Sequence, residues 1–286
     1  MHEALPLSTA RQATEHVTFS FRMTNQPGAR VAWIHVAPIK ALAIQELQQV
    51  ELGLKGVEND RRFCIVDADG RMLNAKRVQR FVAVRPHFDD ATRRLLLEMP
   101  DGSMVEGAIA LGRPITVSIY GRSVGARAID GPWADALSAL ADRPLQLVRF
   151  DSPGEGVDRA DEGAGASLLA EESLRAIAKA AGVTAPVDPR RFRMLFGVAG
   201  VEAHAEDAWI GRGVRIGSAV VVPGGNIGRC AVTTLDPRTG LSNLDTLAAL
   251  ARYRNEEVTS EPLAFGVWAR VAQAGVVRIG DAVHAA

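Results

Sequence analysis

The chain has 286 residues, 47% of them hydrophobic and 23% charged, and its 33 basic and 33 acidic side chains give a formal net charge of zero. A chain of this length buries enough surface to form a core without disulfides or structural metals. The balanced charge argues against general binding to nucleic acid or to an anionic membrane surface. No apolar run reaches about 18 residues, so the sequence predicts no membrane span.

Cysteine usage and the start of the chain bear on the cellular compartment. The two cysteines, Cys64 and Cys230, are too few for a zinc or iron–sulfur site built from cysteine alone. Unpaired thiols suit a reducing cytosol, so we predict a cytoplasmic protein. Residues 1–28 lack the apolar core of a secretory signal and are expected to form a loosely ordered extension.

The first half of the chain is predicted to be rich in short strands. Residues 31–36 come first, and 43–54 mix helical and strand cues but are assigned mostly to strand. Further strands are expected at 62–67, 81–84, 95–99, 115–120 and 124–129. Turn signals of Gly, Pro and Asp divide them at roughly ten-residue spacing, which favours a β-barrel or sandwich. A short helix at 132–140 and a strand at 145–150 follow.

The second half mixes strands with helices. Residues 151–165 are rich in Gly and acids, which is typical of a linker or mobile loop. Apolar residues at helical spacing predict a helix over 167–181, and Ser242 or Asn243 is a candidate cap for a later one. Strands are expected at 191–198, 214–222, 231–235, 265–271 and 276–279. We therefore divide the chain into an extension (1–28) and two domains (29–150 and 151–286).

The stretch from Gly224 to Gly240 presents Cys230 after a glycine-rich approach and before the Asp236-Pro237 turn. A thiolate is a strong soft metal ligand and a good nucleophile when it is exposed and deprotonated. Neighbouring Arg229 favours the thiolate, and the glycines let another molecule approach the backbone. Cys64 lies in an apolar run and is expected to be a small buried hydrophobe.

Several motifs, in order and spacing, resemble the MOSC domain family, named for the C-terminal domain of molybdenum-cofactor sulfurases. The layout is closest to the mitochondrial amidoxime reducing component and its bacterial relatives. The matching segments are Pro38-Ile39-Lys40, 56–63, 73–77, 188–193, 206–211, Arg229-Cys230, 233–240, 265–269 and 278–281. Three places depart from the family's pattern: Ala41, Met194-Leu195 and 225–228.

The resemblance implies a β-rich α+β fold, in which an N-terminal MOSC-associated β-barrel domain packs on a MOSC β-barrel domain with peripheral helices. It also implies a molybdenum cofactor (molybdopterin) between the two domains, with Cys230 as the metal ligand and catalytic residue. The residues that would bind the cofactor are Lys40, Arg61, Asn74, Arg191, Arg193, Thr234 and Asp236. Surface ion pairs remain open for the three cations Lys40, Arg61 and Arg193, as do turn or capping roles for Asn74 and Asp236.

The activity implied by the resemblance is reduction of N-hydroxylated or N-oxide small molecules. Because the chain has no cysteine set for a second redox centre, this activity would need a separate electron-transfer protein. Two other functions stay open, motivated by the departures and by the sulfurase relatives. In one, Cys230 is the nucleophile of a cofactor-free enzyme acting on a small anionic substrate. In the other, Cys230 carries a persulfide to a partner.

Overall fold

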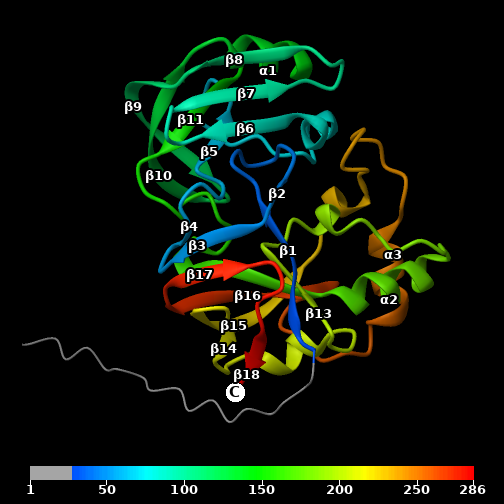
Figure 1. Cartoon of the computed structure of the whole chain (residues 1–286). Coiled ribbons are helices and arrows are strands. Elements are labelled where there is room, and N and C mark those ends of the chain that lie inside the picture. Colours follow the sequence, from blue (N-terminus) through cyan, green and yellow to red (C-terminus); the bar gives the residue numbers. More distant parts are fainter. Residues whose placement is uncertain (1–27) are drawn as a thin grey trace, which may run out of the picture.

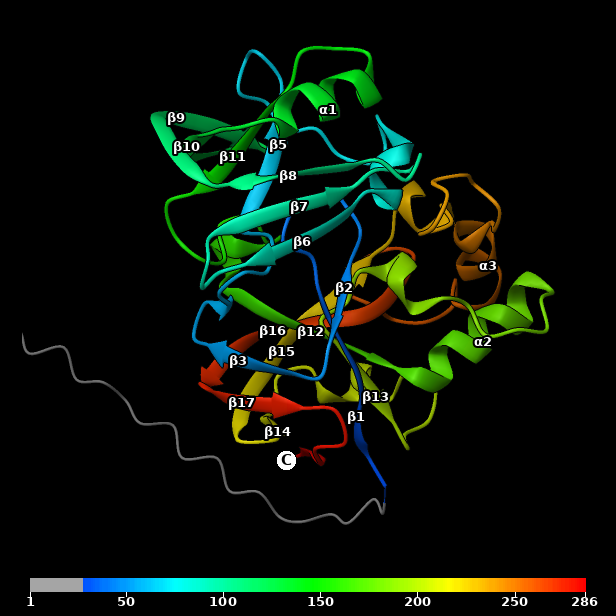
Figure 2. The ribbon, with the colours of Figure 1, turned by 45° about the horizontal axis from the view of Figure 1, so that its top comes forward.

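A computed structural model describes residues 28–286 of the chain, so the predicted extension falls outside the described residues except for Gly28. The chain is mostly β, with an upper and a lower group of strands in Figure 1. Helices α2 (Glu171–Ala181) and α3 (Thr246–Tyr253) lie together at one side of the lower group in both views (Figures 1 and 2). No helix of residues 28–286 combines the length and the apolar character needed to cross a membrane.

The upper group contains two antiparallel sheets and one helix. Its strands are β5 (Phe63–Val66), β6 (Arg85–Asp89), β7 (Arg94–Glu98), β8 (Met104–Ala108), β9 (Ala110–Ile119), β10 (Arg122–Asp130) and β11 (Gln146–Phe150). The sheet orders are β5-β11-β10-β9 and β6-β7-β8. Helix α1 (Trp133–Ala141) packs against this group. Its first residue, the fully buried Trp133, donates its indole N–H to the carbonyl of Leu95 in β7 at 3.1 Å.

The lower group is built on an eight-stranded sheet with the order β18-β14-β15-β16-β12-β13-β1-β2. Its strands are β1 (Arg30–Val36), β2 (Gln45–Leu47), β12 (Ala164–Ala170), β13 (Phe196–Ala199), β14 (Val214–Ile216), β15 (Ala219–Gly228), β16 (Ala264–Gln273) and β18 (Val283–Ala285). A three-stranded sheet, β17-β3-β4, joins Gly275–Arg278 to Gln49–Gly53 and Gly56–Val57. Buried Ile34, Leu168, Phe196 and Val267 belong to the core between these strands.

The predicted fold class is confirmed, but the strand ladders do not close into complete barrels. In the eight-stranded sheet, β1, which lies next to the end strand β2, meets the segment before β18, the strand at the other end, at one isolated antiparallel bridge between Arg30 and Ala282. Three backbone hydrogen bonds reinforce this contact, from Val31 to Asp281 at 2.9 Å, from Gly280 to Val31 at 2.8 Å and from Val283 to Ala29 at 3.0 Å. The strand at this seam, β18, has only three residues, so the closure is shorter than a full ladder.

Strands from the start of the chain hydrogen-bond to strands near its end. Strand β1 pairs with β13, and β3 pairs with β17. The segments that follow β1 and β4 therefore leave the lower group and enter the upper group, where Lys40 donates its backbone N–H to Phe63 at 2.8 Å. These crossings place residues 37–44 and 58–62 between the two groups. The domain boundary that we draw at residue 150 stays a prediction.

The remaining helices are short. Helices α2 (Glu171–Ala181) and α3 (Thr246–Tyr253) are α-helical. Five 3-10 segments occur at Gln79–Ala83, Ala160–Glu162, Pro189–Phe192, Ala205–Trp209 and Ala231–Thr234. The structure confirms the predicted strands at 31–36, 62–67, 95–99, 115–120, 124–129, 145–150, 265–271 and 276–279 and the helix at 132–140, within a few residues at their ends. The single strand predicted at 214–222 is instead a hairpin, in which β14 and β15 are joined by a turn at Gly217-Ser218.

Two predictions failed because a buried strand or a proline turn was misread. Residues 167–170 belong to strand β12, and the helix begins only at Glu171. Strand β12 lies inside the sheet between β16 and β13, and such a strand shows no polar alternation to separate it from a helix. Residues 191–198 split into a 3-10 turn, capped by Asp188 and started by Pro189, and a shorter β13.

Three further predictions failed through local side-chain bonding or burial. The run 231–235 is a 3-10 turn, because Thr233 and Thr234 donate their hydroxyls to carbonyls three residues back, at 3.0 and 2.8 Å. Residues 81–84 also lie in or next to a 3-10 turn, which buries Phe81. Helix α3 begins later than expected, because Asp245 caps it rather than Ser242 or Asn243.

Candidate functional site

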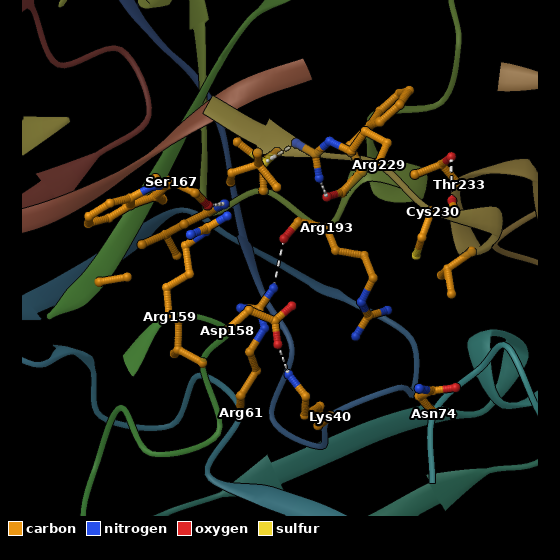
Figure 3. Close-up of a pocket in the computed structure, with 18 of the residues that line it drawn as sticks. Lys40, Arg61, Asn74, Asp158, Arg159, Ser167, Arg193, Arg229, Cys230 and Thr233 are labelled. Carbon is orange, nitrogen blue, oxygen red and sulfur yellow. Dashed lines mark hydrogen bonds and ion pairs between the residues drawn. The ribbon is translucent and has the colours of Figure 1, made fainter. Parts of the chain in front are cut away.

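A cavity of about 340 Å³ lies where the crossing segments meet the end of β15. Its wall combines residues 40–41, 60–61 and 74–76 with residues 157–159, 191–195, 227–230 and 232–233. Figure 3 shows side chains from these segments converging on one open space. The cavity therefore joins parts of the chain that are far apart in sequence.

Cys230 lies two residues after the end of β15, where it begins the 3-10 turn Ala231–Thr234. It is half-buried, free of any disulfide, and part of the cavity wall. Its carbonyl accepts hydrogen bonds from both the backbone N–H and the hydroxyl of Thr233, each at 3.0 Å. Thr233 is itself held by Thr246 of α3 across 2.6 Å. The turn thus fixes the Cys230 backbone and leaves its sulfur facing the open space in Figure 3. Cys64, in contrast, is fully buried, as predicted, and burial raises the pKa of its thiol.

Helix α3 supports this turn, and its N-cap offers a test. The Asp245 carboxylate accepts a hydrogen bond from the Ala248 N–H at 2.9 Å. We expect Asp245→Ala to lower the free energy of unfolding by about 1 kcal/mol in urea titrations, because an orphan helix donor is exposed. Asp245→Asn keeps the cap and should stay within about 0.5 kcal/mol of the wild type. Equal losses in both variants would contradict a capping role.

Lys40 is a buried cation at one side of the cavity, with 6% of its surface exposed. Its ammonium donates to the Asp158 carboxylate at 2.6 Å and to the Gly156 carbonyl at 2.8 Å. Burial lowers the pKa of Lys40, and the nearby Asp158 charge opposes that shift. The lysine is therefore held in place by the segment that follows β11.

Arg61 and Arg193 bring two guanidinium groups to the same cavity. Arg61 pairs with Asp60 and donates to the Arg193 carbonyl at 2.7 Å. Arg193 donates through Nη1 to the Leu42 carbonyl at 2.7 Å, while its buried Nη2 has no partner in the described structure. Burial lowers the pKa of Arg193 to about 10, so the group stays charged at neutral pH. An unpartnered buried donor beside a cavity is a feature that an anionic ligand would satisfy.

Unfavourable backbone conformations concentrate at this cavity. Nine described residues other than glycine have positive φ. Five of them line the cavity, namely Ala41, Arg61, Tyr120, Arg159 and Arg193. Such conformations cost about 1–3 kcal/mol each and cluster at sites where function requires the geometry. The unfavourable backbone conformations therefore support the same cavity as the functional site that the side chains indicate.

The other predicted site residues divide into two sets. Asn74 lines the cavity, and its side-chain oxygen also accepts the Lys76 N–H at 3.1 Å. Arg191 reaches the cavity wall but donates to the Thr234 carbonyl at 2.9 Å and to Asn243. Thr234 and Asp236 are absent from the wall.

Asp236 and its neighbours instead stabilise the loop behind Cys230. The Asp236 carboxylate accepts from the backbone N–H of Arg238 at 2.8 Å and from the Asn243 amide at 2.9 Å. Backbone N–H groups, the Asn243 amide and the Arg191 charge together hold its pKa below the ordinary value despite the opposing effect of burial. Direct cofactor contact by Thr234 or Asp236 is not supported by these positions, whereas the capping alternative for Asp236 is.

Arg229 is engaged by the protein rather than free beside the thiol. Its guanidinium donates to the Phe265 carbonyl at 2.8 Å and to the Phe192 carbonyl at 3.0 Å. It also contacts the sulfur of Met194 at 2.9 Å, one of the positions that departs from the family's pattern. Burial lowers the pKa of this guanidinium, although arginine remains charged at neutral pH. Arg229 therefore provides a fixed positive charge in the wall.

Sequence reasoning missed Tyr120, Asp158, Arg159 and Trp268, which also line the cavity. The segment 151–165 was predicted as a linker because it is rich in glycine and acids. That composition instead reflects close packing: Cβ atoms at Gly154 and Gly156 would overlap the carbonyls of Lys55 and Arg61. The sequence signal that indicates a packed, functional segment at 151–165 is its pattern of glycines alternating with single charged residues.

Two family models match most of the chain. A family model described as the MOSC N-terminal beta barrel domain matches residues 28–136, and one described as the MOSC domain matches residues 160–284. Mitochondrial amidoxime-reducing component 1 of Xenopus laevis is 27% identical over 284 residues, which covers 89% of this chain and 81% of that protein. Mitochondrial amidoxime reducing component 2 of Rattus norvegicus is also 27% identical, with coverage of 88% and 81%.

The human protein and two solved structures complete the comparison. Human mitochondrial amidoxime-reducing component 1 is 24% identical and covers 92% of this chain and 84% of its own length. The YuaD protein of Bacillus subtilis aligns with a TM-score of 0.40 and 12% identity, covering 89% of this chain and 93% of that one. The YiiM protein of Geobacillus stearothermophilus aligns with a TM-score of 0.31 and 14% identity, covering 62% and 72%.

Proposed function

The chain belongs to the MOSC family, and from that premise we propose that it is a molybdenum-cofactor enzyme that reduces N-hydroxylated small molecules. Relatives that match most of its length carry the name amidoxime-reducing component. The observation that best supports the proposal is chemical. One cavity contains a free, half-buried thiol on Cys230 and an unpartnered buried donor on Arg193.

The residues of the cavity fit such a cofactor. A molybdopterin carries a phosphate, and Arg193 Nη2 is a buried donor that lacks an acceptor. Lys40 and Arg61 add two more positive charges within the same wall, and arginine forks suit phosphate oxygens. A soft thiolate is the ligand type that suits a metal of this kind. A volume of about 340 Å³ lies in the range of small-molecule sites.

We assign roles to the predicted residues as follows. Cys230 would bind the metal, Lys40, Arg61 and Arg193 would bind the phosphate, and Asn74 would offer its amide to the polar edge of the pterin. Arg191, Thr234 and Asp236 would act indirectly by holding the Cys230 turn, because their hydrogen bonds lie within that turn or the loop behind it.

The reaction has a simple balance. Reducing an N-hydroxyl group breaks the N–O bond, consumes two electrons and two protons, and releases the oxygen as water. When bound, the cofactor supplies the two-electron oxygen-atom chemistry. The chain's own residues bind and orient it, and Arg229 contributes a fixed positive charge next to Cys230. We infer that a separate electron-transfer protein delivers the electrons.

Metal and pterin analysis of the purified protein tests this function. Protein from cells supplied with molybdate should contain molybdenum and pterin in equal amounts, and should reduce an aromatic amidoxime to the amidine with a chemical electron donor. A metal-free, inactive protein, prepared under conditions that load an amidoxime-reducing relative, would contradict the proposal. A covalent substrate adduct on Cys230 in metal-free protein would instead favour the nucleophile hypothesis.

A further inference from the structure

The loop between β11 and β12 brings a carboxylate into the cationic part of the cavity. Asp158 accepts a hydrogen bond from Lys40 at 2.6 Å, which Figure 3 marks with a dashed line. The Asp158 side chain is 68% exposed, whereas that of Lys40 is only 8% exposed. The carboxylate therefore sits at the open side of a buried ammonium, where an incoming anion would approach.

Asp158 offsets part of the positive charge in the cavity wall. Of the cations in the wall, Arg61 already pairs with Asp60, whose other oxygen accepts the Ala37 N–H at 2.9 Å. Asp60 and Asp158 are the only carboxylates that line the cavity within the described residues. The positive charges of Lys40, Arg61 and Arg193 lower the pKa of Asp158 below its ordinary value. Asp158 is thus an ionised group that neutralises part of the anion-binding charge.

The backbone on both sides of Asp158 is held in place. On one side, Gly156 packs without room for a side chain, and Arg122 donates to the Val157 carbonyl at 3.1 Å. On the other side, Arg159 pairs with Glu162 and Glu261. A rotation of the Asp158 side chain therefore requires no opening of the loop.

We propose that Asp158 is a displaceable counterion, which takes the anion's place beside Lys40 and swings out when a dianion binds. When a monoanion displaces the Asp158 carboxylate, the negative charge next to Lys40 stays the same. When a dianion such as a phosphate monoester or inorganic phosphate displaces it, that negative charge increases by one. Asp158 would therefore set the charge that a ligand must carry to enter the site. This inference goes beyond the proposed reaction, because it concerns anion binding by the chain alone.

Phosphate binding to Asp158→Asn tests the proposal without any metal. Inorganic phosphate is titrated calorimetrically at pH 8 and constant ionic strength into purified, cofactor-free protein. We expect the variant to bind phosphate about fivefold more tightly than the wild type, because the competing carboxylate is removed. Nitrate, a monoanion, should compete with phosphate in the variant but not in the wild type.

Matched variants separate this effect from a general change of charge. Asp161→Asn removes an exposed acid of the same loop that does not line the cavity, and its phosphate affinity should stay within about twofold of wild type. Lys40→Met should weaken phosphate binding about tenfold, because a charged partner is lost. If Asp158→Asn proves unstable, Asp158→Ser should show the same tightening and a larger phosphate-induced rise in Tm.

Two outcomes would overturn the inference. One is a folded Asp158→Asn or Asp158→Ser protein that binds phosphate no more tightly than wild type. The other is the absence of phosphate binding in wild type and both variants. Molybdenum and pterin contents are measured separately from phosphate affinity, so a failure of this inference is distinguishable from a failure of the proposed reaction.

Discussion

Replacing Cys230 by serine is expected to remove bound molybdenum and to lower amidoxime reduction by at least about a hundredfold. Serine retains the shape of the side chain but offers a hard hydroxyl that stays protonated at neutral pH, so it is a poor ligand for a thiophilic metal. Cys230 is only half-buried, so the free energy of unfolding should change by no more than about 1 kcal/mol. Metal analysis, turnover and urea unfolding of the same preparation measure all three quantities.

Cys64→Ala is the matched control for this experiment. Cys64 is fully buried in a core cluster next to Val148 and Phe150. Its loss should cost about 1–2 kcal/mol of stability through the cavity it leaves, yet spare the metal content. The two variants should therefore show opposite patterns. A Cys230→Ser protein that keeps its molybdenum in full would exclude a direct thiolate–metal bond.

Several residues of the site could be predicted from the sequence, but the interaction partners of those residues could not. Lys40, Arg61, Asn74, Arg193 and Cys230 all line one cavity, although up to 190 positions separate them. Short motifs identified them because each is a local arrangement of charge and turn residues. What a local pattern does not contain is the partner of each charge, since Lys40 meets Asp158 across 118 positions of the chain.

The same limit explains the errors in secondary structure. Leu168 and Leu169 have helical spacing with Leu174 and Ile177, but they are buried in a strand with neighbours on both edges. Whether these leucines form a helix or a strand depends on the neighbouring strands with which they pair, β13 and β16, which come from residues 196–199 and 264–273. The β-branched Thr233 predicts a strand, whereas its hydroxyl donates a hydrogen bond to the Cys230 carbonyl. In both cases tertiary or side-chain contacts override local propensity.

The strongest signal for the site is one that the sequence does not reveal. Positive φ at Arg61 and Arg193 is surprising for long side chains without a glycine's freedom. The Arg61 guanidinium donates a hydrogen bond to the Arg193 carbonyl at 2.7 Å. The unusual backbone conformation therefore directs both side chains into the cavity. Strain of this kind is stable only where surrounding structure over-determines it, here the crossing segments between the two groups of strands.

Glu206 should make the stability of the protein depend on pH near neutrality. Its side chain is fully buried, its carboxyl oxygens lack partners in the described structure, and nearby Arg254 pairs with Asp207 instead, at 2.5 Å. Burial raises the pKa of Glu206 from 4.5 to about 7. The native state thus keeps a proton that the unfolded chain releases, and the free energy of unfolding should fall by about 3 kcal/mol as pH rises from 4.5 to 7.

Glu206→Gln removes this titration while preserving the shape of the side chain. Because the amide adds a constant offset, the informative quantity is the change within each protein between pH 5 and pH 8.5. Urea unfolding should show wild type losing about 2–3 kcal/mol more than the variant over that interval. Glu202→Gln, which alters an exposed acid of the same segment, should follow wild type within about 0.5 kcal/mol. Parallel pH profiles for wild type and Glu206→Gln would mean that the buried carboxyl is already ionised in the native state, with its charge compensated by groups around it.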